Sequence, residues 1–414
     1  MQNGVYRLFA GTPRFCRSGN RRPGPALTLS GIRGSMKQIT MLLFKGAMDM
    51  SKTELERGEE RGAAGQRLSD CASLFTREEI GSVSAERVPT GFPALDRSLN
   101  GGLFNGLFVL GAVPGLGKST LALQIANNLS GRGYPVLYFA LEMNRAWITA
   151  KALCRTDFAL HRQPSFQAAD LLKMGKQFTD QEWERINQAR ELVERDGRNL
   201  YLYEQGPELT HIGQIRQHIR AFRERYRAEG GTRPILVVVD YLQILTPRDA
   251  SLKFSDKQIV DDNIRELCAI RDQEQVMILL ISALNRSSYN KEISLESFKE
   301  SGSIEYSADV ILGMQYQGMQ YQGEEWPKGK NPFSLEEAKA RNPRKLELTL
   351  LKMRYGQDGV RIPLEFYSGS SYFQEPEGTE QVQPARIQEL REKFGAWPVQ
   401  YHDGFHQKAR RLRG

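Results

Sequence analysis

The chain has 414 residues, 40% of them hydrophobic and 26% charged, which indicates a soluble globular protein of one large domain or two ordinary ones. The net charge of +8 would suggest a nucleic-acid partner, but the positive charge is concentrated at the N-terminus. Residues 1–48 hold eight basic and no acidic residues, so residues 49–414 carry 57 − 8 = 49 basic residues against 49 acidic ones. Most of the chain is therefore neutral, and nucleic-acid binding by it requires local patches.

The N-terminal segment differs from the rest in composition. Residues 1–50 are predicted to form a disordered basic tail or to lie upstream of the true start, with an organellar transit peptide as the alternative. Three methionines are plausible starts: Met36, Met48 and Met50. Residues 51–88 are polar and predict a linker with a short helix. The apolar run "ITMLLF" is far shorter than the roughly 20 residues of a membrane span, so no membrane association is expected.

Cysteine and histidine give no sign of a metal centre. The four cysteines are widely spaced and form neither a metal-ligand spacing nor a disulfide framework, which favours a reducing cytoplasm. The five histidines give no zinc pattern and are expected to be surface or structural residues.

From Thr90 onward, apolar runs alternate with amphipathic stretches. The apolar runs predict strands at residues 107–112, 135–142, 199–204, 234–240, 276–282, 308–314, 345–354 and 360–367. Helical periodicity predicts helices at 119–133, 179–197, 210–231 and about 257–272. This order predicts an α/β domain over residues 89–375, with a mostly parallel central sheet flanked by helices and an antiparallel hairpin at its edge. Residues 376–414 are expected to form a basic tail.

Two of the predicted helices have distinctive faces. The helix at 179–197 starts with the capping box Thr179–Glu182. Its expected buried face consists of Trp183, Ile186, Ala189, Leu192 and Val193. The helix at 210–231 is expected to turn its isoleucines inward and to present outward Arg216, Arg220, Arg223 and Arg227. These arginines either face solvent or contact nucleic acid or a neighbouring subunit. The five-residue repeat in "GMQYQGMQYQG" (313–323) is too short for a structural repeat and predicts a loop.

The stretch "GAVPGLGKST" (residues 111–120) lies between a predicted strand and a predicted helix, which is the context that a phosphate-binding loop requires. Ala112 stands where the stricter pattern has glycine, with Gly111 before it. Gly115 and Gly117 allow backbone N–H groups to turn inward, and the helix N-terminus presents its positive end to phosphate. The sequence therefore predicts a nucleotide site at this turn.

Two side chains of this turn have specific expected roles. Lys118 reaches the β- and γ-phosphates, and Ser119 supplies a hydroxyl to Mg²⁺. The residues expected to bind ATP are Ala112, Pro114, Gly115, Leu116, Gly117, Lys118, Ser119 and Thr120.

Two carboxylates complete the predicted site. Asp240 ends the fourth predicted strand, and a carboxylate at the C-terminal end of a parallel strand lies over the same crevice as the phosphate loop. Asp240 is therefore expected to hold Mg²⁺ together with Ser119. Tyr241 follows it, which disfavours families whose hydrolytic acid is the next residue. Glu142, at the end of the second predicted strand, is the candidate to orient the attacking water, and an ordinary helix-start residue is the alternative.

Together these segments resemble the ATPase domain of DnaB-type replicative DNA helicases, in the RecA-like superfamily. The segments that carry the resemblance are "TGFPALDRSLNGGLFNGLFVLGAVPGLGKST", "FALEM", "VVVDYLQIL", "SALNRSSY" with "FKESGSIEYSADVI", and "KMRYGQDG". They stand in the family's order over residues 90–375. The resemblance implies a RecA-like P-loop core, in which Glu142 is the catalytic glutamate.

The resemblance also implies an assembly. It implies a homo-hexameric ring with ATP and Mg²⁺ between subunits, single-stranded or forked DNA in the channel, and 5′–3′ unwinding during bacterial or mobile-element replication. Lys352 and Arg354 share one face of a strand and would act on the γ-phosphate of the neighbouring subunit's ATP. Lys151 matches a basic residue near the γ-phosphate. The channel loops, 247–257 and 287–296, would contact the DNA backbone through Arg248, Lys253, Lys257, Tyr289 and Lys291.

The chain departs from the family pattern in two places. The family has glutamine in "SQLNR" where this chain has Ala283, so an amide that senses the γ-phosphate is missing. Either Ser282 or Asn285 substitutes for it, or the coupling between hydrolysis and movement is altered. The family also has a helical N-terminal collar that engages primase. Only 89 residues precede Thr90 and little of them resembles a folded core, so a collar is not expected. A primase or a loader is a candidate partner.

Three functions are compatible with these motifs. The first is an ATP-dependent DNA helicase or single-strand translocase of the replicative type. The second is a RecA-like DNA-dependent ATPase with a regulatory or recombination role and no unwinding, which Ala283 and the absence of a collar motivate. The third, a small-molecule kinase on a P-loop, lacks a recognisable acceptor pocket or lid.

Overall fold

The structure of the chain is a computed structural model. It describes Ala72 and residues 86–204, 210–247, 255–298, 301–321 and 333–376. The chain divides into two units, residues 1–83 and 84–414, and the fold described below belongs to the second. The expected N-terminal and C-terminal tails, and nearly all of the expected linker, lie outside the described residues.

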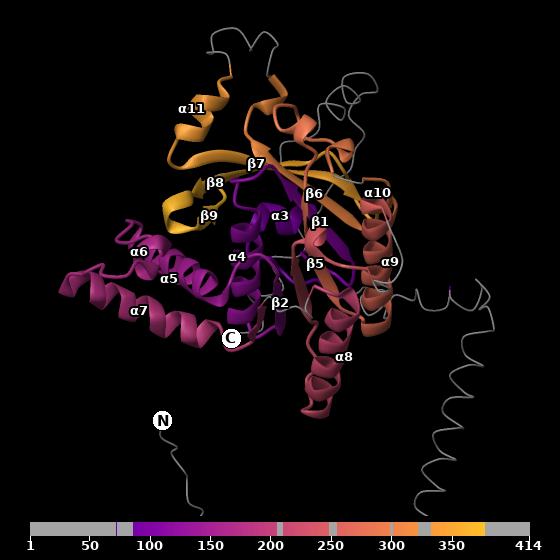
Figure 1. Cartoon of the computed structure of the whole chain (residues 1–414), viewed down its shortest axis with the longest axis horizontal. Coiled ribbons are helices and arrows are strands. Elements are labelled where there is room, and N and C mark those ends of the chain that lie inside the picture. The colour runs from indigo at the N-terminus through magenta and orange to yellow at the C-terminus, as the bar shows by residue number, and fades with distance from the viewer. Residues whose placement is uncertain are drawn as a thin grey trace, which may run out of the picture. The chain divides into compact units, whose positions relative to one another are not determined.

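The described residues form one nine-stranded sheet with the order β3-β2-β4-β5-β1-β6-β7-β8-β9 (Figure 1). The strands are β1 (Leu107–Ala112), β2 (Val136–Ala140), β3 (Leu200–Glu204), β4 (Leu236–Asp240), β5 (Met277–Ala283), β6 (Val310–Tyr316), β7 (Arg344–Met353), β8 (Arg361–Tyr367) and β9 (Tyr372–Gln374). All pairs from β3 to β6 are parallel, and the pairs from β6 to β9 are antiparallel. This arrangement confirms the mostly parallel sheet with an antiparallel edge.

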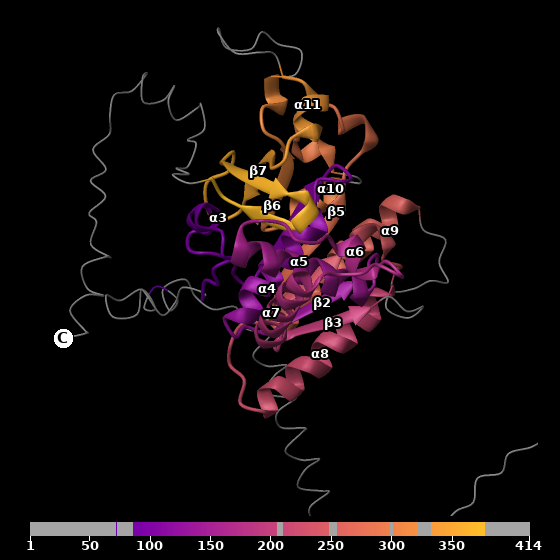
Figure 2. The same cartoon turned by 90° about the vertical axis from the view of Figure 1, so that its left-hand side faces the viewer.

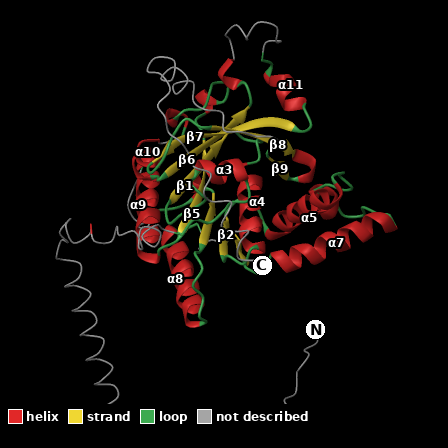
Figure 3. Ribbon diagram, turned by 180° about the vertical axis from the view of Figure 1, so that it is seen from behind, coloured by secondary structure: helices red, strands yellow, loops and turns green. Residues whose placement is uncertain are grey.

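Helices cover both faces of the sheet (Figure 3). They are α3 (Pro93–Ser98), α4 (Lys118–Gly131), α5 (Arg145–His161), α6 (Ala168–Leu172), α7 (Asp180–Asp196), α8 (Ile212–Ala228), α9 (Asp256–Glu274), α10 (Ser301–Ser307) and α11 (Leu335–Ala340). One apolar core joins the sheet to α3 and α4, and a second core on the other face joins it to α8, α9 and α10. Figure 2 shows α5, α6 and α7 together on the side of β2 and β3. Within the described residues, no helix is long and apolar enough to cross a membrane.

The central strands are apolar without interruption because both faces of them are covered. Every residue of β1, β2 and β4 is buried, and β8 at the antiparallel edge alternates buried and half-buried positions instead. Each fully buried Val, Leu, Ile or Phe side chain contributes about 1.5–3 kcal/mol relative to an exposed one. Apart from the Tyr138 hydroxyl, the polar side chains of β1, β2 and β4 are therefore confined to the strand ends.

The structure corrects the predicted helix faces in part. The capping box of Thr179 and Glu182 is present, but Trp183 is 50% exposed because the buried stripe of α7 is narrow and consists of Ile186 and Ala189. The predicted outward arginines of α8 also divide into two groups.

Two of those arginines bind acidic residues of α9 instead of facing solvent. Arg216 lies 2.9 Å from Glu266, and Arg223 is 8% exposed with its Nη1 4.0 Å from Glu274. These pairs tie α8 to α9, since opposite charges at short range offset the cost of burying them. Only Arg220 and Arg227 of this set are exposed, so the helix does not present a continuous basic face.

The predicted loop at 313–323 is wrong in its first part. Residues 313–316 belong to β6, and all of them are buried between β1 and β7. Met314 and Tyr316 lie in the core on one face of the sheet. Part of the repeat is therefore a buried strand, although the shortness of the repeat predicted a loop.

The first prediction concerns Gly111, which lies inside β1 and not in the turn that follows it. A Cβ atom at this position would lie 2.4 Å from Phe298 Cε1 and 2.9 Å from Leu284 Cδ2, both on buried side chains. We expect Gly111→Ala to lower the free energy of unfolding by about 1–3 kcal/mol through overpacking. Urea denaturation measures this change. Gly369→Ala is the control because its Cβ would meet Gln167 only at 3.8 Å, and an equal loss in both variants would contradict the packing explanation.

Candidate functional site

The turn between β1 and α4 has the backbone of an anion site. Gly115 and Gly117 have φ angles of 81° and 90°, in the left-handed region that favours glycine. A Cβ on Gly117 would also lie 2.9 Å from Phe366 Cζ and 3.0 Å from Phe373 Cζ. No side chain caps the first turn of α4, so its N–H groups and the positive end of its dipole remain directed at the turn.

The predicted residues of this turn take two roles. The side chains of Ala112, Leu116 and Thr120 are buried in the domain and fix the path of the turn. Pro114 and Gly115 are exposed, and Lys118 and Ser119 are half-buried at the start of α4. The second group is therefore the part of the turn that an incoming ligand meets.

Ser119 and Asp240 are brought together as the sequence predicts. The Ser119 hydroxyl donates to Asp240 Oδ1 at 3.0 Å, and the hydroxyl of Tyr138 donates to Oδ2 at 2.9 Å. Asp240 is 1% exposed, and burial raises the pKa of its carboxyl above the ordinary value, while the two hydrogen bonds oppose that rise. A hydroxyl and a carboxylate at a phosphate turn suit Mg²⁺, which usually keeps several waters and phosphate oxygens as its other ligands. The described residues contain no cluster of three or more histidine, cysteine or acidic side chains that would hold a metal alone.

Lys118 and Glu142 belong to the same edge of the sheet. Burial lowers the pKa of the Lys118 ammonium, and the nearby carboxylates of Asp240 and Glu142 oppose that fall. Glu142 is exposed and follows β2, whose last residue, Ala140, pairs with Asp240. The carboxylate of Glu142 is therefore accessible to solvent beside the buried one of Asp240.

Lys151 also reaches the turn. It lies on α5, and its Nζ donates to Thr120 Oγ1 at 3.1 Å. Its pKa is lowered, chiefly by burial and then by the neighbouring charge of Arg155. The structure thus brings a second lysine to the start of α4.

Three residues that the sequence did not single out contact the site. Tyr138 holds Asp240 from β2, and Arg344, the first residue of β7, donates from Nη1 to the Gly115 carbonyl at 3.2 Å. Gln243 accepts from the Ala283 N–H at 3.0 Å and donates to Ser282 Oγ at 3.0 Å. No local signal marks these residues, because each contact joins elements that are distant in sequence.

The proposed substitutes for the missing glutamine at position 283 are engaged elsewhere. Ser282 is fully buried and bonded to Gln243. The Asn285 amide donates to the carbonyls of Glu296 and Phe298, at 3.2 Å each, and so braces the loop that follows β5. The side-chain amide bonded to Ala283 is that of Gln243, which holds the end of β5 against the segment after β4.

Lys352 and Arg354 lie far from the phosphate turn of their own chain. Met353 pairs with Val310, which pairs with Phe108, whereas the turn follows Ala112. Four residues of strand correspond to about 13 Å, so the two cations lie at the opposite edge of the sheet.

Both cations bind the end of α10 and the residues after it. Lys352 Nζ donates to the carbonyls of Glu305 and Ala308, the latter at 2.8 Å. Arg354 donates to the Tyr306 carbonyl at 3.0 Å and pairs with Asp309 at 3.1 Å. The helix α10 belongs to the core on the sheet face opposite α4. Lys352 and Arg354 therefore bind on the opposite face of the sheet from the helix that starts at the turn, as well as near the opposite ends of the parallel strands.

The predicted channel loops are only partly described. Residues 248–254, with Arg248 and Lys253, lie outside the described residues, and Lys257 is in the first turn of α9. Lys291 is exposed as expected, but Tyr289 packs partly buried against the core. Tyr289 is therefore a structural contact in this chain, since its ring is apolar surface that the core covers.

The sheet order, the glycine turn and the acid at the end of β4 define a RecA-like P-loop core. Residues 87–375, more than half of the chain, match the family described as DnaB-like helicase C terminal domain. The chain belongs to this family.

Known proteins agree with this assignment. The chain is 27% identical over 255 residues to Replicative DNA helicase DnaB of Helicobacter pylori, covering 61% of this chain and 48% of that protein. It is 30% identical over 259 residues to Replicative DNA helicase DnaC of Bacillus subtilis, covering 62% and 52%. The chain thus spans about half the length of the curated relatives it matches.

Two solved structures share the fold. An ATPase domain aligns with a TM-score of 0.59 and 23% identity, covering 76% of this chain and 100% of that one. A DnaB-like replicative helicase, described with its interactions with primase, aligns with a TM-score of 0.58 and 21% identity, covering 83% and 77%. At these identities the likeness supports the fold.

The second prediction follows from the raised pKa of Asp240. When the pKa of a carboxyl is higher in the folded state than in the unfolded state, the folded state binds its proton more tightly. The stability of the fold therefore falls as pH rises from the unfolded-state pKa to above the folded-state pKa. Without nucleotide or Mg²⁺, we expect Asp240→Asn to raise the melting temperature at pH 8, and we expect this gain to shrink as pH falls toward 3.8, the ordinary pKa of an aspartate. Melting curves across this range measure it. Asp358→Asn, at an exposed position, is the control, and a gain for Asp240→Asn that grows toward low pH would contradict the assignment.

Proposed function

We propose that the chain is the motor of an ATP-dependent DNA helicase of the replicative type, acting as a homo-hexameric ring in the bacterial cytoplasm. The observation that carries this proposal is the division of the predicted catalytic groups between two edges of one sheet. The P-loop, Glu142 and Asp240 lie at one edge, and Lys352 and Arg354 lie at the other. Such a division gives a complete site only between two subunits.

The edge with the P-loop supplies most of the chemistry. The backbone of the turn and Lys118 bind the phosphates of ATP, and Ser119 and Asp240 hold Mg²⁺, which neutralises charge on the phosphate oxygens. Glu142 accepts the proton of the attacking water, since it is exposed and next to Lys118 and Asp240. Arg344 holds the Gly115 carbonyl and keeps the turn closed on the phosphates.

The far edge supplies positive charge to the next subunit. Arg354 and Lys352 act on the γ-phosphate of the neighbour's ATP, where positive charge stabilises the transition state. In the single chain both groups bind carbonyl oxygens, and Arg354 also pairs with Asp309. Formation of the interface therefore exchanges these contacts for contacts with phosphate.

DNA and partner proteins complete the proposal. Single-stranded DNA passes through the ring, and exposed Lys257 and Lys291 are described residues of the proposed channel loops that suit backbone contact. Movement runs 5′–3′ on forked DNA, with a primase or a loader as partner. The regulatory DNA-dependent ATPase without unwinding has less support, because the matched relatives are named replicative helicases.

The third prediction tests this function with purified full-length chain. We expect ATP hydrolysis that single-stranded DNA stimulates and separation of a forked duplex, and Lys118→Ala abolishes both together with ATP binding. We expect Glu142→Gln to bind ATP normally but to lower turnover by about 100-fold or more, as loss of a general base does.

The control for the second substitution is Glu191→Gln, at an exposed position of α7. It retains full turnover. Hydrolysis at the same rate with and without DNA, and no strand separation, would refute the helicase proposal. Near-normal turnover by Glu142→Gln would move the base to another residue.

The fourth prediction tests delivery of Arg354 to a neighbour. Arg354→Ala and Glu142→Gln subunits are each inactive alone, and we expect an equal mixture to recover about a quarter of normal ATPase activity. A quarter is the share of interfaces that join an intact Glu142 to an intact Arg354 under random assembly. Arg225→Ala, on the exposed side of α8, mixed with Glu142→Gln gives the activity of simple dilution. A mixture as inactive as its two components places Arg354 in its own chain's site.

A further inference from the structure

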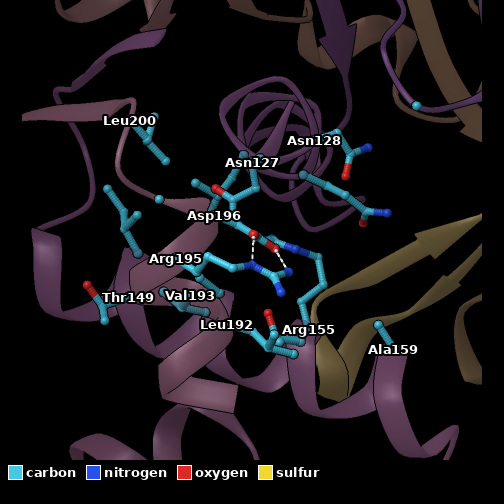
Figure 4. A pocket seen from close by; sticks show the side chains of 18 of the residues that line it. Asn127, Asn128, Thr149, Arg155, Ala159, Leu192, Val193, Arg195, Asp196 and Leu200 are labelled. Carbon is cyan, nitrogen blue, oxygen red and sulfur yellow. Dashed lines mark hydrogen bonds and ion pairs between the residues drawn. The ribbon is translucent and has the colours of Figure 1, made fainter. Parts of the chain in front are cut away.

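A cavity of about 620 Å³ lies behind the P-loop helix (Figure 4). Its walls come from the middle of α4, from α5, from the end of α7 and from β3. None of residues 112–120 lines it, so it is separate from the phosphate turn. Its volume falls in the range of sites that enclose small organic molecules.

Arg155 of α5 is the unusual residue of this cavity. It is 5% exposed, and its Nη1 has no hydrogen-bond partner among the described residues. With the Asn127 amide turned so that its oxygen faces α5, that oxygen accepts from Arg155 Nη2, which leaves Nη1 still unpaired. A buried donor without a partner is costly and uncommon in folded proteins.

The charge of Arg155 is also uncompensated. Burial lowers its pKa to about 10, and the groups that oppose this fall are Tyr138 and Cys154. Neither is a carboxylate, and burial raises the pKa of both, so neither carries a negative charge at neutral pH. A buried cation normally has an anionic partner, and no ion pair joins Arg155 to a carboxylate among the described residues.

The rest of the lining determines what kind of molecule fits. The one carboxylate among the lining residues is that of Asp196, which accepts two hydrogen bonds from Arg195, at 2.6 and 3.1 Å (Figure 4). Leu123 and Leu192 contribute apolar wall, and Thr149 contributes a hydroxyl. The lining thus combines an unpaired guanidinium with apolar surface.

We propose that this cavity binds a small organic anion, whose phosphate or carboxylate group pairs with Arg155 and whose apolar body packs against Leu123 and Leu192. A guanidinium forms strong charge-assisted hydrogen bonds with both kinds of group. The ligand supplies the negative charge that Arg155 lacks. This site lies outside the phosphate turn.

The fifth prediction is tested by calorimetry on the full-length chain, with its phosphate turn saturated by a non-hydrolysable ATP analogue and Mg²⁺. The probes are phenyl phosphate, benzoate and inorganic phosphate, with phenol as the neutral probe of the same body. We expect phenyl phosphate or benzoate to bind, and the stronger of the two identifies the preferred group. Phenol and inorganic phosphate bind at least about tenfold more weakly, because each lacks half of the recognised features.

Two substitutions locate the binding. Arg155→Met removes the charge, and Ala159→Trp fills the cavity from the next turn of α5 without altering Arg155. We expect each to weaken binding of the preferred probe by at least about tenfold. Arg225→Met, at an exposed site on α8, is the control and leaves binding unchanged.

Three results would overturn the proposal. They are no binding of either organic anion at about 10 mM, binding that survives both cavity substitutions, and phenol binding as tightly as the anions. Because Ala159→Trp leaves the buried arginine in place, it keeps the test valid if Arg155→Met alters folding.

Discussion

Burial of both faces of the parallel strands is the constraint on which the rest of the domain depends. β1, β2 and β4 contain no exposed residue, and all their polar side chains except Tyr138 stand where a strand ends. Parallel strands end at the same edge, and this places Asp240, Glu142 and the glycine turn together without any further device. Asp240 illustrates the cost of placing a charged group there. Burial raises the pKa of its carboxyl, and the hydrogen bonds from Ser119 and Tyr138 oppose that rise.

The antiparallel strands beyond β6 bring a second group of polar side chains to the opposite end of the parallel strands, where β1 begins. Asp309 organises it, because its carboxylate accepts from the Leu107 N–H at 2.8 Å and pairs with Arg271 at 2.7 Å and with Arg354 at 3.1 Å. The start of β1, the end of α9 and the end of β7 are thereby held at one point. Reversal of chain direction at β7 is what carries Lys352 and Arg354 to this edge while Arg344, at the other end of the strand, reaches the phosphate turn.

Local sequence predicted the parts of this protein that depend on local physics. The uninterrupted apolar runs predicted the buried strands, and Thr179 with Glu182 predicted the start of α7. The spacing from Gly115 to Ser119 predicted the turn, and strand ends predicted that Ser119 and Asp240 would meet. The roles assigned to Glu142 and Arg354 remain predictions, because they depend on water and on a neighbouring subunit.

Contacts between distant elements were beyond the reach of sequence patterns. Gln243, in the turn after β4, is bonded to Ala283 at the end of β5, and periodicity contains no information about such a pair. Arg223 was expected in solvent because helical spacing places it beside exposed positions, yet α9 offers Glu274 there. Trp183 was expected in the core because it shares a helical face with Ile186 and Ala189, but the elements packed on α7 cover only a narrow stripe.

The placement of the two polar edges has a geometric consequence for any assembly. If one subunit's far edge completes the next subunit's phosphate edge, the contact is heterologous, and such contacts repeat head to tail until they close. A closed ring then has as many complete sites as subunits, whereas an open chain always has one phosphate edge without its partner cations. Opening a ring to admit a DNA strand would therefore inactivate one ATP site. The subunit that cannot hydrolyse ATP would then mark the position of the opening.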